Sequence, residues 1–383
     1  NLLWLRKTLE GYETRPLLDE LFQKLEQHPK IDIHTKTQVV GSYGQVGNFY
    51  TTIENSEGVV KTLEHGVTIL ATGGEEAVPG EYHYGKHTAI VTQKELEQQL
   101  DEKALDPEKL QSVVMIQCVG SREEPRNYCS RICCASALKN ALYLKEHNPD
   151  IMITILYRDM MSYGFAEAYY TQARRADIIF IQYSLDEKPR VSVPENSAGS
   201  ATTVQVSTLD PILGRELQIE ADLVILASGL VPNLPVALAN GFEATLDQDG
   251  FFEEAESKWR PVDSLKEGVF ACGIAHSPRS IPESIATAEA AAQRALRILN
   301  QEHLSAGKIV AVVRHSLCSL CERCIEACPY QARRLDSELE QVVVNPAMCQ
   351  GCGSCAMVCP NSASILEGYK EQQMFGIIDA SLY

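Results

Sequence analysis

The chain has 383 residues, with 51 acidic side chains against 34 basic ones and a formal net charge of −17. A charge of this sign disfavours nucleic acids and anionic membrane surfaces as partners. Its length predicts two or three domains, and its apolar runs are shorter than a membrane span. Thirteen cysteines, an odd number gathered in motifs, indicate thiolate ligands in a reducing compartment, so we expect a cytoplasmic protein without direct membrane insertion.

Residues 47–74 predict a two-stranded hairpin followed by a buried apolar strand that ends in Thr72, Gly73 and Gly74. Residues 203–229 repeat this order. The repetition predicts two related dinucleotide-binding α/β domains, in which ligands lie at the carboxyl ends of strands. The three residues that end the first buried strand are therefore candidates for contact with a flavin's phosphates or ribose. A tight strand exit explains the same residues without a ligand.

Residues 112–159 predict a strand, a loop, a helix and a second strand, which together form a βαβ unit. A pyridine-nucleotide domain carries GxGxxG at its first turn, but the loop after Gln117 contains Gly120 alone. The cysteines of this loop and of the helix start are Cys118, Cys129, Cys133 and Cys134. Their spacing is compatible with a further iron–sulfur cluster, with a redox-active dithiol or disulfide, and with inert core cysteines. The first two interpretations exclude ordinary nicotinamide binding here.

Two later segments carry weaker signals. Residues 185–200 are rich in Pro, Ser, Glu and Gly and predict an exposed loop. Residues 268–273, GVFACG, predict a short buried strand, and an alanine-rich helix follows after a loop. A strand exit aimed at a helix N-terminus suits the polar face of a flavin and is equally explained as a structural βα turn. Cys272 lies inside this strand with no other cysteine nearby in the sequence, so we expect a buried apolar side chain.

The most specific motif, CxxCxxCxxxCP, occurs twice within residues 318–360. Four thiolates hold one iron–sulfur cubane, and in two-cluster proteins the fourth cysteine of each motif ligates the other cluster. One predicted cluster is held by Cys318, Cys321, Cys324 and Cys359. The other is held by Cys349, Cys352, Cys355 and Cys328. Neither zinc sites nor a disulfide framework explains three close cysteines and a distant one in both copies.

Together these motifs resemble one known family. QCVGSR followed by YCSRICC, the run LGRELQIEADLVILASGLVPN, GVFACG followed by IPESIATAEAAA, and the double cysteine motif occur in the order seen in the A subunit of heterodisulfide reductase. The resemblance covers nearly the whole chain, downstream of that family's first FAD-binding βαβ unit, whose GxGxxG this sequence does not contain. We therefore expect an N-terminal portion to be missing, and the adenine and pyrophosphate of FAD to be held by residues outside this chain.

The resemblance implies an α/β fold with two dinucleotide-binding-type, thioredoxin-reductase-like domains and a C-terminal α+β ferredoxin domain with two [4Fe–4S] clusters. Residues 1–95 are expected to form a partial FAD-binding domain, and residues 96–235 an NADPH-domain-like region with an extra iron–sulfur site. Residues 236–305 return to the FAD-binding domain, and residues 306–383 form the bacterial-type ferredoxin domain.

The resemblance also assigns cofactor ligands, and it implies no further catalytic residue. The cysteines at 118, 129, 133 and 134 are expected to hold a third [4Fe–4S] cluster, of the noncubane-motif type, where a thioredoxin reductase holds NADPH. The residues expected to border the FAD are Ala71, Thr72, Gly73, Gly74, Gly229, Gly273, Ile274, Ile281, Pro282 and Ser284.

The function implied by the resemblance is electron transfer in a heterodisulfide reductase-like complex, with flavin-based electron bifurcation between a mid-potential donor, ferredoxin and a disulfide-reducing partner. One alternative is a non-bifurcating relay protein in a related quinone/sulfur or aromatic acyl-CoA reductase complex. Another is an NAD(P)H-dependent flavoprotein reductase with an appended ferredoxin, which the lack of a glycine-rich loop after Gln117 disfavours. Expected partners are the other subunits of such a complex, an electron-donating protein and free ferredoxin, around a homodimer of the core subunit.

Overall fold

The structure is a computed structural model that describes residues 5–193, 203–233, 236–302, 309–346, 348–367, 369 and 371–382. The chain divides into two compact units. The first unit comprises Asn1–His34, Thr72–Asn233 and Gly273–Ile285. The second unit comprises Thr35–Ala71, Leu234–Cys272 and Ala286–Tyr383. The four domains drawn from the sequence stay a prediction.

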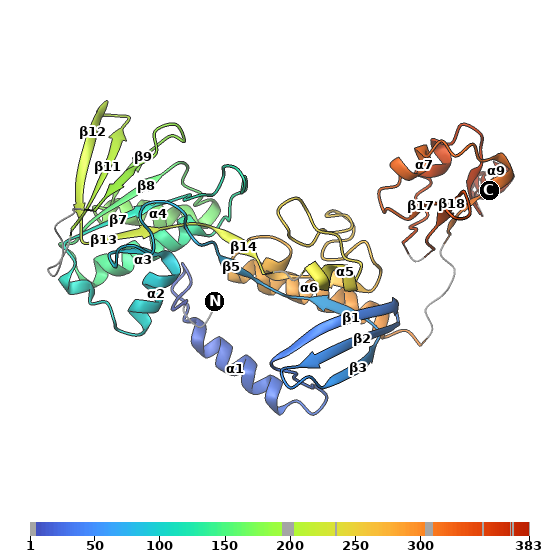
Figure 1. Cartoon of the computed structure of the whole chain (residues 1–383), viewed down its shortest axis with the longest axis horizontal. Helices are drawn as coiled ribbons and strands as arrows, with labels where there is room; N and C mark the ends of the chain where they lie inside the picture. The colour runs from blue at the N-terminus through green and yellow to red at the C-terminus, as the bar shows by residue number, and fades with distance from the viewer. Residues whose placement is uncertain are drawn as a thin grey trace. The chain divides into compact units, whose positions relative to one another are not determined.

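The first unit is built around a parallel sheet with strand order β6-β13-β7-β8-β9 (Figure 1). Its strands are β6 (Ile90–Thr92), β7 (Ser112–Ile116), β8 (Met152–Tyr157), β9 (Ile179–Gln182) and β13 (Leu223–Leu226). The helices of this unit are α1 (Thr14–Gln27), α2 (Gln93–Asp101), α3 (Cys133–His147) and α4 (Glu167–Arg175). The βαβ unit predicted over residues 112–159 is confirmed as β7, α3 and β8.

Alternate residues of β7 point to opposite faces of the parallel sheet. Val113 and Met115 pack into one core cluster with residues of α2, α3 and α4. Val114 and Ile116 pack into a second cluster with residues of an antiparallel sheet. Because side chains alternate along a strand, a sheet that is covered on both faces needs a continuous apolar run. This explains why the strand reads SVVMI, without a polar residue at every second position.

The antiparallel sheet of the first unit consists of β10 (Arg190–Ser192), β11 (Val204–Asp210) and β12 (Arg215–Ala221). Its β11–β12 pair confirms the hairpin predicted within residues 203–229. The prediction of an exposed loop over 185–200 is wrong for β10, which pairs with β11 and buries Val191. Alternation of Val191 with polar neighbours forms an edge strand despite the loop-like composition. Residues 194–200 of that prediction lie outside the described residues.

The second unit contains an antiparallel meander of β1 (Thr37–Gln45), β2 (Asn48–Asn55) and β3 (Val60–His65). In the turn after β2, the side-chain oxygen of Asn55 accepts hydrogen bonds from the backbone N–H groups of Glu57 and Val59. Gly58 adopts a φ of 78°, which glycine tolerates without strain. These turn residues explain why the hairpin predicted within residues 47–74 forms where the sequence places it.

Two strands of the second unit pair in parallel, β4 (Thr68–Leu70) with β15 (Val269–Ala271). Next to β15, Cys272 is 6% exposed and packs with Val262 and Phe270, which confirms the prediction of a buried apolar cysteine. The helices of the second unit that precede its cysteine-rich region are α5 (Val236–Gly241) and α6 (Ile281–Leu299). The first turn of α6 belongs to the first unit. In the first unit, β5 (Gly74–Glu76) and β14 (Leu230–Pro232) form a further antiparallel pair.

The cysteine-rich region consists of two short antiparallel strand pairs, β16 with β19 and β17 with β18, and short helices. Its strands are β16 (Ala311–Val313), β17 (Arg333–Asp336), β18 (Gln341–Val344) and β19 (Ser364–Leu366). Its helices are α7 (Arg323–Glu326), α8 (Ser354–Met357) and α9 (Glu371–Leu382). Left-handed residues precede both motif helices, Glu322 before α7 and Gly353 before α8, so the two copies of the cysteine motif fold alike.

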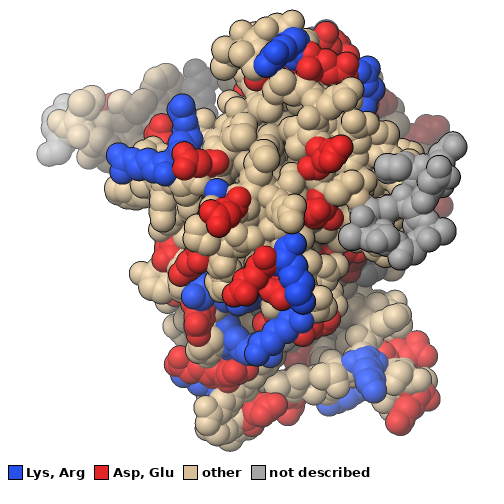
Figure 2. Space-filling view, turned by 90° about the vertical axis from the view of Figure 1, so that its left-hand side faces the viewer, with Lys and Arg blue, Asp and Glu red and all other residues tan. Residues whose placement is uncertain are grey.

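The surface mixes both signs of charge on the face shown in Figure 2, where acidic and basic side chains are interspersed among uncharged ones. None of the helices in the described part of the chain combines the length and apolar character needed to cross a bilayer.

Candidate functional site

Two cavities in the cysteine-rich region are each lined by four cysteines. Those of the first cavity are Cys318, Cys321, Cys324 and Cys359. Those of the second are Cys328, Cys349, Cys352 and Cys355. In each cavity three cysteines come from one motif and the fourth from the other, which is the grouping that the sequence predicts. That each cavity holds a [4Fe–4S] cluster stays a prediction.

Backbone N–H groups point at several of these sulfur atoms. The N–H of Ala332 donates to the Sγ of Cys328 at 3.3 Å, and the N–H of Ala363 donates to the Sγ of Cys359 at 3.2 Å. In both motifs the donor residue lies four positions after the fourth cysteine, which is the one that lines the other motif's cavity. Burial acts to raise the pKa of Cys359, but backbone donors outweigh it, so the pKa of this thiol is lowered. Such donors stabilise a thiolate ligand.

The residues around the cavities fit an iron–sulfur cubane. Within the described residues, no three His, Cys, Asp or Glu side chains are grouped so that they could hold a single metal ion. A cubane makes a different demand, since each of its four irons takes one thiolate and the sulfurs lie around the cluster. Four cysteines around one cavity, with N–H groups aimed at their sulfurs, meet that demand.

The remaining predicted ligands are gathered in the first unit, between the end of β7 and the start of α3. Cys118 follows β7 and adopts a φ of 59°, and Cys133 and Cys134 are the first residues of α3. The backbone N–H of Arg131 donates to the Sγ of Cys129 at 3.3 Å. All thirteen cysteines lie in the described residues, and all are free thiols, so no disulfide links these four.

Burial and mutual repulsion disfavour thiolates in this group. Burial raises the pKa of Cys134 to about 11 and that of Cys133 well above its usual range. The other three sulfurs each raise the pKa of Cys133 further, which places all four cysteines within electrostatic reach. The dipole of α3 favours a thiolate at Cys133, but burial is the larger effect. An iron–sulfur core supplies the positive charge that four thiolates in such a place require.

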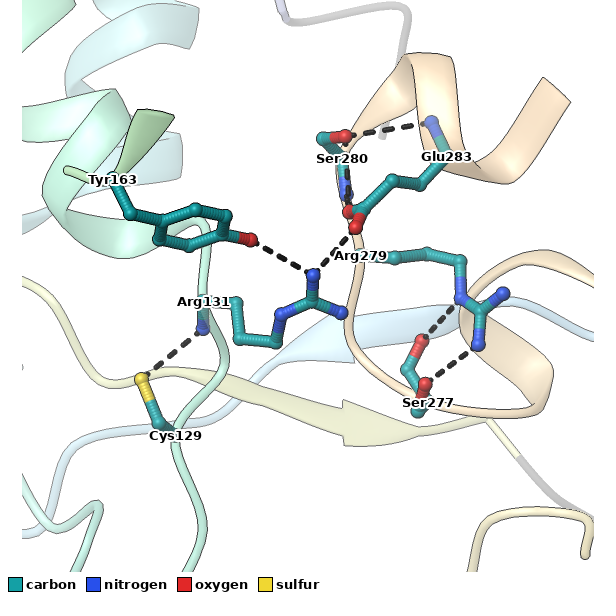
Figure 3. Close-up of polar contacts among 7 residues, drawn as sticks. All are labelled: Cys129, Arg131, Tyr163, Ser277, Arg279, Ser280 and Glu283. Carbon is teal, nitrogen blue, oxygen red and sulfur yellow. Dashed lines mark hydrogen bonds and ion pairs between the residues drawn. The ribbon is translucent and has the colours of Figure 1, made fainter. Parts of the chain in front are cut away.

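A polar network joins this cysteine loop to the start of α6 (Figure 3). The guanidinium of Arg131 forms an ion pair with Glu283 and donates to the hydroxyl of Tyr163 at 2.8 Å. Glu283 also accepts from the backbone N–H of Ser280 at 2.9 Å, while the hydroxyl of Ser280 accepts from the N–H of Glu283 at 3.4 Å. This reciprocal pair is a capping box, so one carboxylate both caps α6 and holds Arg131.

The residues predicted to border the FAD include two close backbone approaches within the first unit. A Cβ on Gly74 would lie 2.5 Å from the Cγ2 of Ile274, and a Cβ on Gly229 would lie 2.8 Å from the hydroxyl oxygen of Ser130. Gly74 and Ile274 are therefore brought together. Gly229 instead lies against the cysteine loop.

The hydroxyl of Thr72, next to Gly73 and Gly74 in the sequence, shows whether a polar ligand would fit here. The hydroxyl oxygen is buried and has no hydrogen-bond partner in the described structure. Such a group requires an acceptor or donor that the described residues do not supply, and the phosphates and ribose of FAD offer both.

The remaining residues predicted to border the FAD lie near the start of α6 or in the second unit. Gly273 has a φ of 63°, and its hypothetical Cβ would be 3.9 Å from the Cβ of Ser284. Ile281 and Pro282 form the first turn of α6, and Ala71 belongs to the second unit.

Sequence reasoning missed Arg131, Tyr163 and Glu283. Arg131 stands between Cys129 and Cys133, two predicted ligands, in the motif CSRICC, which is a usable signal. Glu283 follows Ser280 by three residues, the spacing of a capping box. Nothing in the sequence around Tyr163 links it to either segment.

Comparisons with known proteins agree with these features. A family model described as a 4Fe-4S dicluster domain matches residues 317–363. The A subunit of the H(2):CoB-CoM heterodisulfide,ferredoxin reductase of Methanothermobacter marburgensis is 37% identical over 287 residues, which is 70% of this chain and 42% of that protein. The iron-sulfur A subunit of the CoB--CoM heterodisulfide reductase of Methanocaldococcus jannaschii is 36% identical over 288 residues, 70% of this chain and 43% of that one.

The chain thus spans less than half the length of these relatives. Among solved structures, a thioredoxin reductase of T. acidophilum is 19% identical and covers 75% of this chain and 80% of its own, with a TM-score of 0.47. That similarity is too weak to add to the assignment. The parallel and antiparallel sheets with their helices, together with the dicluster match, confirm the predicted α/β fold class with a C-terminal two-cluster domain.

Proposed function

Because the chain belongs to the family of heterodisulfide reductase A subunits, we propose that it is the electron-transferring, iron–sulfur and flavin-binding component of an oxidoreductase of that kind. The observation that carries this proposal is the sorting of eight cysteines into two four-cysteine cavities. Each cavity offers the four cysteine sulfurs that one cluster needs.

Three cysteine groups would hold clusters, two in the C-terminal region and one between β7 and α3. Thr72, Gly74 and Ile274 would border the FAD. When bound, a flavin exchanges electrons in pairs or singly and each cluster exchanges one at a time, so the protein's part is to fix positions and tune potentials. The described residues serve this part: the backbone N–H groups of Ala332 and Ala363 orient sulfurs, and the side chain of Arg131 ties the cysteine loop to Glu283.

The proposed partners follow from the names of the relatives, which are subunits of enzymes for the CoB–CoM heterodisulfide, hydrogen and ferredoxin. For this chain we propose an electron donor of middle potential and two acceptors, ferredoxin and a disulfide-reducing protein of the same complex, with bifurcation at the flavin. Reconstitution with such partners tests this point. Simultaneous reduction of a low-potential and a high-potential acceptor supports bifurcation, whereas reduction of one acceptor alone makes the chain a relay.

The test of the cofactor assignment is analysis of iron and acid-labile sulfide in protein purified without oxygen. Three [4Fe–4S] clusters require about twelve irons per chain. About eight would mean that the cysteine group between β7 and α3 carries no cluster. Iron-free protein that is fully folded under these conditions would overturn the proposal, because buried thiols and an unpartnered Thr72 hydroxyl would then have another explanation.

A further inference from the structure

Arg333 is a buried arginine in the cysteine-rich region. It begins β17 and is 5% exposed, whereas its neighbour Arg334, on the opposite side of the strand, is exposed. Arginine is almost never buried to this degree unless its charge is paired. The position of Arg333 therefore requires a partner that balances its charge.

Arg333 lies where the two cysteine-lined cavities meet. It lines the cavity that contains Cys324 and Cys359, and it also lines the cavity that contains Cys328 and Cys349. Of the described residues, it alone lines both cavities. A long side chain with a branched, planar end group is suited to reach two neighbours from one backbone position.

The terminal nitrogens of Arg333 lack oxygen and nitrogen partners in the described part of the chain. Nη1 and Nη2 are both buried and make no hydrogen bond to a nitrogen or oxygen of the described residues. The group near enough to accept from the guanidinium is a sulfur, that of Cys324. A guanidinium has N–H donors and no acceptor, so the missing partner must be an acceptor, and a negatively charged one balances the buried charge best. The cavities on either side are lined by cysteines, whose thiolates and bound clusters carry negative charge.

The charge of Arg333 acts on sulfurs of the first cavity even without a cluster. Burial raises the pKa of Cys324, and the guanidinium of Arg333 works against that rise. The same guanidinium is one of the groups that lower the pKa of Cys359. Arg333 thus lies within electrostatic reach of two of the four predicted ligands of one cavity, one from each motif.

We infer that Arg333 is a positioning residue shared by the two C-terminal clusters, whose guanidinium donates N–H bonds to sulfur atoms of both and raises both reduction potentials. This inference rests on the proposed function, since it requires clusters in both cavities. Each cluster accepts one electron without making or breaking a bond to the protein, and the added negative charge remains on the iron–sulfur core and its ligands. N–H donors and a nearby positive charge stabilise that reduced state.

The experiment compares the full chain with Arg333→Leu, Arg333→Lys and the matched control Arg334→Leu. The last removes the same charge from the exposed side of the same strand. Iron content is measured first, and the potentials of the paired clusters are then determined by redox titration followed by electron paramagnetic resonance. We expect Arg333→Leu to weaken one-electron reduction of both clusters at least tenfold, a shift of about 59 mV to lower potential for each.

Arg333→Lys keeps the charge but not the planar fork, so both potentials should fall by less, and Arg334→Leu should leave them in place. If the leucine variant loses iron, the lysine variant carries the test. Unchanged potentials in an iron-replete Arg333 variant would overturn the inference, as would a shift confined to one cluster or an equal shift in Arg334→Leu. Parent protein without iron in this region would instead overturn the proposed function.

Discussion

At the scale of single residues, the cysteine sites depend on neighbours that carry no sulfur. A thiolate or cluster ligand in a buried place is stabilised by backbone N–H groups and by positive charge. Ala332 and Ala363 contribute through their backbones, so their side chains leave little trace in the sequence. Arg333 contributes through its side chain, yet a lone arginine in a strand usually faces solvent. Such roles are visible only after folding.

Gly351 is one residue whose replacement should damage the second cysteine motif. It has a φ of 65°, and a Cβ there would lie 2.5 Å from the carbonyl oxygen of Ile309. Because backbone cannot yield as a side chain does, we expect Gly351→Ala to destabilise the region by about 2 kcal/mol or more and to lower iron content. The control Gly376→Ala, in α9 with open space around the Cβ, should keep the iron count and melting temperature of the parent. Equal behaviour of the two variants would contradict the prediction.

Glu76 should make stability depend on pH. Burial raises its pKa from 4.5 to about 7, against the hydrogen bonds from Thr92 and Lys94. The folded state therefore holds this proton more tightly than the unfolded chain does. The contribution of the bound proton to the stability of the fold is fully present below pH 4.5 and is lost as the pH rises through 7. The Gln side chain of Glu76→Gln cannot ionise. At pH 8 we therefore expect the free energy of unfolding of this variant to exceed that of the parent by on the order of 2 kcal/mol, measured by denaturant unfolding.

At pH 4 most of the advantage of Glu76→Gln should vanish, because the parent carboxyl is then protonated in the folded state and mostly protonated in the unfolded state. Glu75→Gln, a change at the exposed neighbour, serves as the control and should show no such difference. A constant effect of Glu76→Gln at both pH values would mean that its carboxyl does not titrate in this window.

At the scale of elements, the sequence predicts best where local signals are complete. The hairpins and the β7–α3–β8 unit have alternating or continuous apolar runs bounded by turn residues such as Asn55 and Gly58. The prediction from sequence fails at β10, whose three residues become a strand only by pairing with β11. The grouping of the eight C-terminal cysteines follows from spacing, whereas the link from the cysteine loop to α6 joins residues 152 positions apart and has no local signal.

The start of α6 gives a prediction at this scale. Ser280→Ala removes the hydroxyl that accepts from the N–H of Glu283, which should cost about 1 kcal/mol of local stability. Amide hydrogens in the first turn of α6 should then exchange about fivefold faster. Ser280→Thr keeps the hydroxyl and should exchange like the parent. If both variants exchange at the parent's rate, the capping box does not hold this helix end.

At the scale of the whole molecule, the chain combines a parallel α/β sheet unit that carries one cysteine group with a C-terminal region that carries two more. Electron transfer requires several redox groups held on one scaffold, and the separate placement of the cysteine groups makes their occupancies separately measurable. The loop before α3 occupies the position where a nucleotide-binding βαβ unit grips pyrophosphate, and its cysteines stand in place of the glycines that a pyrophosphate needs.

Cys133→Ser tests whether this loop binds a cluster independently of the C-terminal region. Ser is a poor ligand for iron, so we expect the variant to lose about four of about twelve irons while the C-terminal pair remains. The control Cys272→Ala removes a buried cysteine that the sequence and the core packing both place outside any cluster, and it should keep all of the iron. Loss of iron from the control as well would indicate general unfolding. A full iron count in Cys133→Ser would leave the four buried thiols of this loop without the cation that their burial requires, and would remove the third cluster from the proposed electron path.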